Sequence, residues 1–113
     1  MIIRVFRAIV HDGKQGEFAD FILNRALPIV ESQPGMLGAS VGMPMPCSPT
    51  EFLMVTTWTD LAALEGFAGP DWQNAVIDPE EAALLEQTFV HHYEGSESET
   101  TAQDAPGADA GAW

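Results

Sequence analysis

The chain has 113 residues, with 4 lysines and arginines against 17 aspartates and glutamates, which gives a formal net charge of −13. This length predicts a single domain. Binding to nucleic acid or to an anionic membrane surface requires a basic patch, so the charge argues against both partners. No apolar run approaches the ~20 residues of a membrane span, and the first residues do not have a signal-peptide pattern, so we expect a cytoplasmic protein.

The single cysteine, Cys47, excludes an internal disulfide, and with three histidines the chain predicts no Cys/His metal site. The acid excess runs through the body of the chain as well as its end. Carboxylates bind water and cations well, so such a surface is typical of a protein from a high-salt (halophilic) source. An ordinary acidic protein with an acidic tail is the alternative interpretation.

The first half of the chain predicts two strands with a helix between them. Residues 2–11 are rich in Ile, Val and Phe and indicate a strand. From Glu17 to about Gln33 the apolar residues follow a 3.6-residue period, which predicts an amphipathic helix, and Pro28 predicts a kink within it. Residues 36–43 predict the second strand. Its apolar face would carry Leu37, Ala39, Val41 and Met43.

The second half predicts a strand, two helical regions and a last strand. Residues 51–58 predict the third strand, and Thr59 or Asp60 would cap the helix that follows. A further helical turn is expected around Trp72–Val76. Asp78-Pro79, with a glutamate three residues after the aspartate, predicts the start of a helix over 80–87. Residues 88–94 predict the closing strand.

The resulting order is βαββαβ within residues 1–95, which predicts an α+β, ferredoxin-like domain with an antiparallel sheet. Residues 96–113 predict an acidic tail. The strands are apolar on both faces, with Ile3, Val5 and Ile9 on one face of the first strand and Ile2, Phe6, Ala8 and Val10 on the other. Helices cover only one face, so we expect a homodimer that packs sheet on sheet.

Four segments of this chain resemble the antibiotic biosynthesis monooxygenase-like (ABM-like) superfamily of small dimeric α/β-barrel proteins. They are residues 1–18, 28–39, 52–76 and 89–94. The most specific match is Trp58 at the end of the third strand, followed at once by an acidic and hydrophobic helix start. The resemblance covers residues 1–95 and implies the ferredoxin-like fold. The superfamily contains quinone-forming oxygenases, haem-degrading enzymes and other proteins.

The resemblance assigns a role to few positions of this chain. Trp58 matches the tryptophan that lines the substrate cavity in both oxygenase branches. The quinone-forming branch has an asparagine where this chain has Met54, and the haem-degrading branch has an asparagine near Arg7. The haem-ligating histidine of that branch corresponds to Val76, so haem degradation is the less favoured activity.

Trp58, His91 and Arg7 are therefore the candidate catalytic residues. Trp58 would be a substrate platform or part of the core. Arg7 would bind an anionic substrate group or pair with an acid such as Glu94, whereas Arg4, on the opposite face, is expected at the interface or rim. His91 and His92 point to opposite faces of their strand, and either one could take a proton from a phenol or be a structural histidine.

The candidate substrate-binding residues are aromatic or apolar, with one histidine; they are Phe67, Trp72, Val76, Tyr93 and His92. We expect no metal and no cofactor. The function that follows is a cofactor-independent monooxygenase acting on a phenolic or quinol-type small molecule. The alternative is a non-catalytic or stress-associated dimer that binds a small aromatic or apolar ligand.

Overall fold

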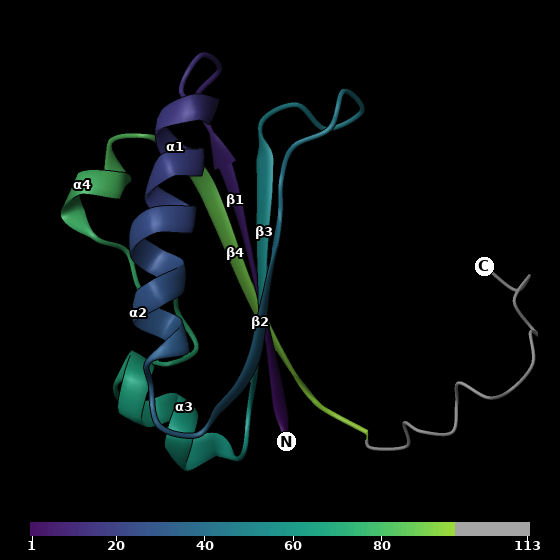
Figure 1. Ribbon diagram of the computed structural model, residues 1–113, viewed down its shortest axis with the longest axis vertical. Helices are drawn as coiled ribbons and strands as arrows, with labels where there is room; N and C mark the ends of the chain where they lie inside the picture. The colour runs from purple at the N-terminus through teal and green to yellow at the C-terminus, as the bar shows by residue number, and fades with distance from the viewer. Residues whose placement is uncertain (97–113) are drawn as a thin grey trace, which may run out of the picture.

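A four-stranded sheet and the helices on one of its faces make up residues 1–96, which the computed structural model describes (Figure 1). The strands are β1 (Ile2–Val10), β2 (Met36–Gly42), β3 (Glu51–Trp58) and β4 (Leu85–Glu94). They are antiparallel and lie in the order β2-β3-β1-β4. This is the predicted ferredoxin-like arrangement. The expected acidic tail, apart from Ser96, lies outside the described residues.

Strand alternation divides the sheet into two faces. Phe6 pairs with Met54 of β3 and Val90 of β4, so residues of the same parity on these strands share a face. The face toward the helices holds the core, in which the Phe18 and Phe52 rings meet edge to face at 4.8 Å. The buried apolar residues are Ala8, Val10, Phe18, Ile22, Val30, Phe52, Met54, Trp58 and Leu64.

The predicted first helix forms, and its backbone hydrogen bonding changes just before Pro28. Figure 1 shows one continuous helical segment made of α1 (Gln15–Phe21), the π-helical turn η1 (Ile22–Ala26) and α2 (Leu27–Glu31). Pro28 has no N–H for the Asn24 carbonyl, so the expected i→i−4 bond is lost. The backbone adapts with a wider turn, in which the Leu27 N–H donates to the Ile22 carbonyl.

The second helical region is shorter than predicted. Asp60 caps α3 (Leu61–Ala68) by accepting the Ala63 N–H at 2.9 Å, but Trp72–Val76 forms turns and loop without helix. The last helix, α4, covers only Pro79–Ala82, and β4 begins at Leu85 instead of residue 88. The end of β1 explains this difference, because Val10 pairs with Leu85. Sheet pairing therefore overrides the helix propensity of residues 83–87.

The second strand also departs from simple alternation. A register shift lies between Met36 and Gly38, and Met36 lies opposite Trp58. Leu37 is consequently 56% exposed and does not share the inner face with Ala39 and Val41. The bulge thus replaces Leu37 by Met36 in the packing against the core.

All the helices of residues 1–96 lie on one side of the sheet (Figure 1). The other side, which we call the open sheet face, carries apolar residues of three strands: Ile3, Val5, Ile9, Leu53, Val55 and Phe89. All six are half-buried. No helix within residues 1–96 has the length and apolar character needed to cross a bilayer.

Candidate functional site

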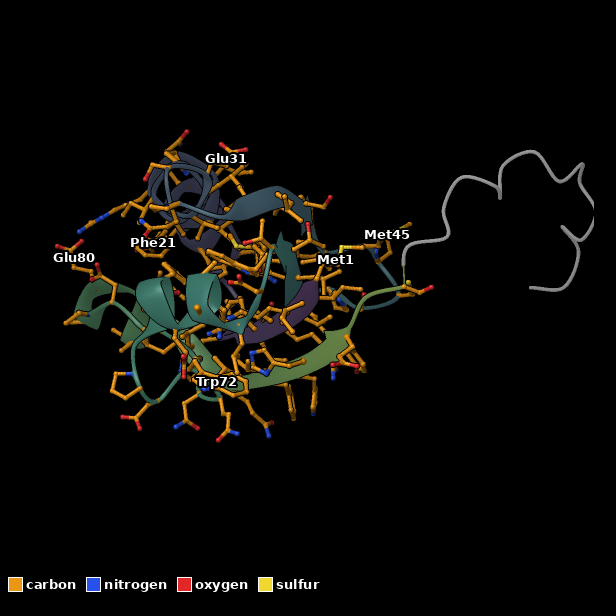
Figure 2. All side chains as sticks on the ribbon, turned by 90° about the horizontal axis from the view of Figure 1, so that it is seen from below. Met1, Phe21, Glu31, Met45, Trp72 and Glu80 are labelled. Carbon is orange, nitrogen blue, oxygen red and sulfur yellow. The ribbon has the colours of Figure 1, made fainter. Side chains whose placement is uncertain are left out.

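A cavity of about 220 Å³ lies between the helical segment, the inner face of the sheet and the chain around α4. Its walls are mainly apolar and come from β1, the helical segment, β3, α3 and the loop before α4; they include Phe6, Phe21, Ile22, Met54, Phe67 and Val76. Figure 2 looks along the helical segment, with Phe21 between this segment and α4. A small apolar cavity with a few polar groups is the usual form of a ligand site.

Arg4 is a buried cation in the wall of this cavity. It is 5% exposed, and its Nη1 and Nη2 atoms donate to the carbonyls of Trp72 and Asn74 at 2.7 and 3.0 Å. None of the salt bridges among residues 1–96 involves Arg4. Burial lowers the pKa of its guanidinium. The expectation that Arg4 lies at the interface or rim is wrong, because β1 directs even-numbered residues toward the helices.

Trp72 and His92 form a pair beside Arg4. Their rings meet edge to face at 4.9 Å, and Figure 2 shows Trp72 beside β4, across α3 from Phe21 in this view. His92 Nε2 lies 3.2 Å from Arg4 Nη1, so Nε2 must be the acceptor of that contact. Burial, the Arg4 charge and His91 lower the pKa of His92, which keeps the imidazole neutral at pH 7. Neither ring lines the cavity.

Trp58 lies one layer behind the cavity wall. It is fully buried, stacks on Phe67 at 5.4 Å and donates its Nε1–H to Thr56 Oγ1 at 2.9 Å. Phe67 and Thr56 line the cavity, whereas Trp58 does not. Because the Thr56 hydroxyl oxygen accepts the indole N–H, the hydroxyl proton of Thr56 remains available to donate to another acceptor. Trp58 thus positions one apolar and one polar group of the cavity wall.

Glu81 is the buried carboxyl group of the site. It is 5% exposed, lines the cavity, and its Oε1 atom accepts the Asp78 N–H at 3.1 Å. Asp78 Oδ1 accepts the Glu80 N–H, which completes the predicted capping box of α4. Burial raises the pKa of Glu81, and the nearby Asp78 charge raises it further, although the hydrogen bond opposes both.

Arg25 lies at the edge of the cavity with its charge already paired. Its guanidinium contacts the carboxylates of Glu80 and Asp78 and lies over the Phe21 ring. Both carboxylates belong to the start of α4. The contacts therefore tie the helical segment to α4 across the cavity edge.

Three of the predicted site residues lie on the open sheet face. Arg7 donates through Nε to Glu51 Oε2 at 2.6 Å and lies over the Phe89 ring, while His91 and Tyr93 follow Phe89 at alternate positions of β4. Arg7 therefore pairs with an acid, as one of its two interpretations held, but with Glu51 instead of Glu94. Strand parity separates these residues from the cavity, so the expectation of a cavity formed by Trp58, His91 and Arg7 together is wrong.

Of the predicted residues, Phe67 and Val76 line the cavity, while sequence reasoning missed Arg4, Thr56 and Glu81. Parity could have found Arg4 and Thr56, because they are even-numbered like the buried residues of β1 and β3. Glu81 was recognised as a cap residue, but its contact with the cavity depends on how α4 packs. No group of three or more potential metal ligands occurs within residues 1–96.

The chain is similar to several solved structures. A protein from Deinococcus radiodurans, provisionally assigned as an antibiotic biosynthesis monooxygenase, has a TM-score of 0.70 at 18% identity over 87% of this chain and 95% of that one. A variant of SnoaB, a cofactor-independent oxygenase from Streptomyces nogalater, has a TM-score of 0.65 at 19% identity over 88% and 96% of the two chains. PA3566 from Pseudomonas aeruginosa has a TM-score of 0.64 at 15% identity over 84% and 93%.

A search of curated proteins gives no match. The sequence model of the antibiotic biosynthesis monooxygenase family matches residues 1–76, which include β1, the helical segment, β2, β3 and α3. The solved structures agree with this match in fold. The chain therefore belongs to the antibiotic biosynthesis monooxygenase family.

Proposed function

We propose that the protein is a cofactor-independent monooxygenase that oxidises a small phenol or quinol in the cavity. The observation that carries the proposal is the apolar cavity of about 220 Å³ with isolated polar groups, in a chain of this family. The similar fold of SnoaB, a cofactor-independent oxygenase, agrees with it. Apolar walls such as Phe67 and Phe21 would exclude water from a reactive substrate anion.

In the proposed reaction the substrate itself reduces O₂. A phenol with a free ring carbon loses its hydroxyl proton and reacts with O₂. One oxygen atom becomes the new carbonyl oxygen of a quinone and the other leaves as water, with all electrons supplied by the substrate. The chain has to remove the proton, hold the anion and exclude solvent. Arg4 and Thr56 are the candidate donors to the anion, because they lie on the inner sheet face at the cavity.

Oxygen uptake tests this proposal. Purified protein, treated with a chelator and free of added flavin, metal or haem, is mixed with a panel of phenols, naphthols and hydroquinones while O₂ is recorded. We expect uptake with at least one member and a quinone whose new oxygen carries label from ¹⁸O₂. No uptake above the uncatalysed rate with any member would refute the proposal.

Ligand binding without turnover is the second candidate function. Met54 favours it, because this residue lines the cavity at the position where the quinone-forming branch has an asparagine. A thioether is a weak acceptor and no donor, so Met54 cannot hydrogen-bond a substrate as an amide does. Saturable binding of the panel with no O₂ uptake would identify this function.

We expect no stoichiometric haem binding. Val76 lines the cavity at the position of the haem ligand and has no atom that can coordinate iron. A titration in which the Soret band saturates at one haem per chain would contradict this expectation.

We also propose a homodimer formed by the open sheet face. An apolar sheet face of several strands without helical cover usually marks an interface, and sheet-on-sheet packing is the simplest way to bury it. The Arg7–Glu51 pair and the Phe89 ring lie on this face and would join the interface.

A further inference from the structure

The Glu81 carboxyl group has one oxygen bound to the backbone and one without a hydrogen-bond donor among residues 1–96. Oε1 accepts the Asp78 N–H at 3.1 Å. Oε2 has no hydrogen-bond donor within residues 1–96. Every fully buried side-chain oxygen or nitrogen of these residues has a partner, so Oε2, which has none, must be accessible. Glu81 is 5% exposed and is one of the residues that line the cavity, so the cavity is where a donor group of a ligand could reach this oxygen.

The charges around Glu81 do not neutralise it. Of the cavity's other charged groups, Arg25 from η1 is already bound to Glu80 and Asp78, and Arg4 from β1 donates to backbone carbonyls. No salt bridge of the described chain includes Glu81. Asp78 repels it. Glu81 is therefore a buried carboxylate with a free acceptor atom and no cationic partner, which favours protonation.

We propose that Glu81 is the catalytic base of the cavity and receives the hydroxyl proton of a small hydroxy-aromatic substrate. The substrate O–H bond breaks, a carboxyl O–H bond forms, and the negative charge moves from Glu81 to the substrate oxygen. Arg4 and Thr56 are the donors available to that oxygen in the same cavity. This inference rests on the proposed function, and Glu81 lies beyond residues 1–76, the part that the family model matches.

The raised pKa of Glu81 supports this role. A phenol such as a tyrosine side chain has a pKa of ~10, so an ordinary carboxylate is too weak a base to take its proton readily. A carboxylate destabilised by burial is a stronger base, which reduces the difference between the pKa of the phenol and that of the carboxyl group. The two histidines that the sequence analysis considered as alternative bases do not replace Glu81, because His91 lies on the open sheet face and His92 does not line the cavity.

Cavity size limits the substrate class. At about 220 Å³ the cavity is smaller than the ~300–1,000 Å³ of typical drug-sized sites. It therefore favours one- or two-ring molecules. The required feature is a hydroxyl group that can donate to Glu81, so a methyl ether of the same ring system should be a poor ligand.

A helix cap is the alternative role for Glu81, and Glu81→Gln separates the two. Gln also completes a capping box at this position, so the cap hydrogen bond to the Asp78 N–H is retained. The variant loses only the carboxylate. Glu65→Gln is the matched control, because Glu65 is exposed on α3, away from the cavity.

The test is binding without oxygen, so it does not depend on turnover. Under anaerobic conditions, phenol, 1-naphthol and 2-naphthol and their methyl ethers are titrated against full-length wild type, Glu81→Gln and Glu65→Gln. For wild type and Glu65→Gln we expect a preference of about tenfold or more for the hydroxyl compounds, as for a hydrogen bond to a charged acceptor. The preference should weaken on acidification. In Glu81→Gln it should fall below about threefold and become independent of pH.

The inference is overturned if wild type binds none of the hydroxyl compounds, or if Glu81→Gln keeps the preference and its pH dependence. Oxygen uptake distinguishes this failure from failure of the proposed function. If wild type and Glu81→Gln consume O₂ at equal rates, the oxygenase proposal stands and Glu81 is only a cap. If the hydroxyl preference depends on Glu81 but no O₂ is consumed, Glu81 recognises the ligand and the oxygenase proposal is wrong.

Discussion

Two arginines three residues apart on β1 have opposite surroundings. Arg4 is 5% exposed and holds the loop before α4 through the carbonyls of Trp72 and Asn74. Arg7 lies on the open sheet face, where its side chain is 38% exposed and pairs with Glu51. A buried donor that satisfies two carbonyls contributes more to stability than an exposed ion pair does.

Replacing each arginine by methionine should reveal this difference. Arg4→Met leaves two carbonyls without their donor and should lower the free energy of unfolding by about 2–4 kcal/mol. It should also make the chain between Gly69 and Asp78 more sensitive to protease. Arg7→Met should have little effect on the monomer. Urea unfolding and limited proteolysis measure both effects, and equal destabilisation by the two substitutions would contradict the assignment of Arg4 as a loop anchor.

Glu81 should make stability depend on pH in a specific direction. Its pKa is higher in the folded chain than the ordinary value of 4.5, so the folded state binds more protons above that pH. Stability is therefore lost as the pH rises from 4.5 through the folded pKa. Glu81→Gln removes this loss and should be more stable than wild type at pH 7, with a difference that shrinks toward pH 4.5. A less stable variant at pH 7 would show that the carboxylate itself stabilises the fold.

At the scale of elements, Gly35 allows the end of the helical segment to approach α3. Its φ is +81°, and a Cβ there would lie 2.5 Å from Ala63 Cβ. Its carbonyl accepts the Thr59 N–H at 2.9 Å. The turn that leads into β2 therefore packs directly on the start of α3, which fixes α3 beside the cavity.

Substitution of two glycines tests this packing. Gly13 also has a positive φ, +95°, but a Cβ there would have no other side chain or backbone atom within 4 Å. Gly13→Ala should lower the free energy of unfolding by about 1–2 kcal/mol, which is the backbone strain alone. Gly35→Ala should cost clearly more, because the methyl group also displaces Ala63. Thermal unfolding compares the two, and equal losses would contradict the close approach.

The strands and the cap residues could be predicted from local sequence, whereas packing decided the rest. β3 and the capping box at Asp78 match the prediction, because a run of apolar and β-branched residues and a cap with a proline after it are local signals. The start of β4 at Leu85 depends on its pairing with β1, and the π turn depends on how the chain compensates for Pro28. The cavity combines residues from distant elements, so sequence patterns identified Phe67 and Val76 but not Glu81.

At the scale of the whole molecule, negative charge and the open sheet face act against each other. The chain has a net charge of −13. The screening length is about 30 Å at 0.01 M salt and about 3 Å at 1 M, so added salt weakens repulsion between two copies. Apolar burial does not weaken with salt. We therefore expect both the dimer fraction and the melting temperature to rise from dilute buffer to 1 M salt.

Light scattering and thermal unfolding across this salt range measure the two quantities. Val55→Glu places a charge on the open sheet face and should abolish the dimer, while Glu65→Gln on α3 should retain it. A monomer at micromolar concentration in 1 M salt would contradict the dimer. A flat or falling melting temperature would contradict the repulsion and the high-salt interpretation.

The cavity is the centre of the functional account, and filling it is the most direct test. Ala26 lines the cavity from η1, so Ala26→Phe should occupy it, whereas Leu23→Phe changes an exposed position of the same turn. The measurement is kcat/KM for O₂ uptake with the best substrate of the panel. We predict a loss of at least about tenfold for Ala26→Phe, with an unchanged melting temperature, and no loss for Leu23→Phe. Wild-type activity in a folded Ala26→Phe variant would show that the reaction takes place elsewhere.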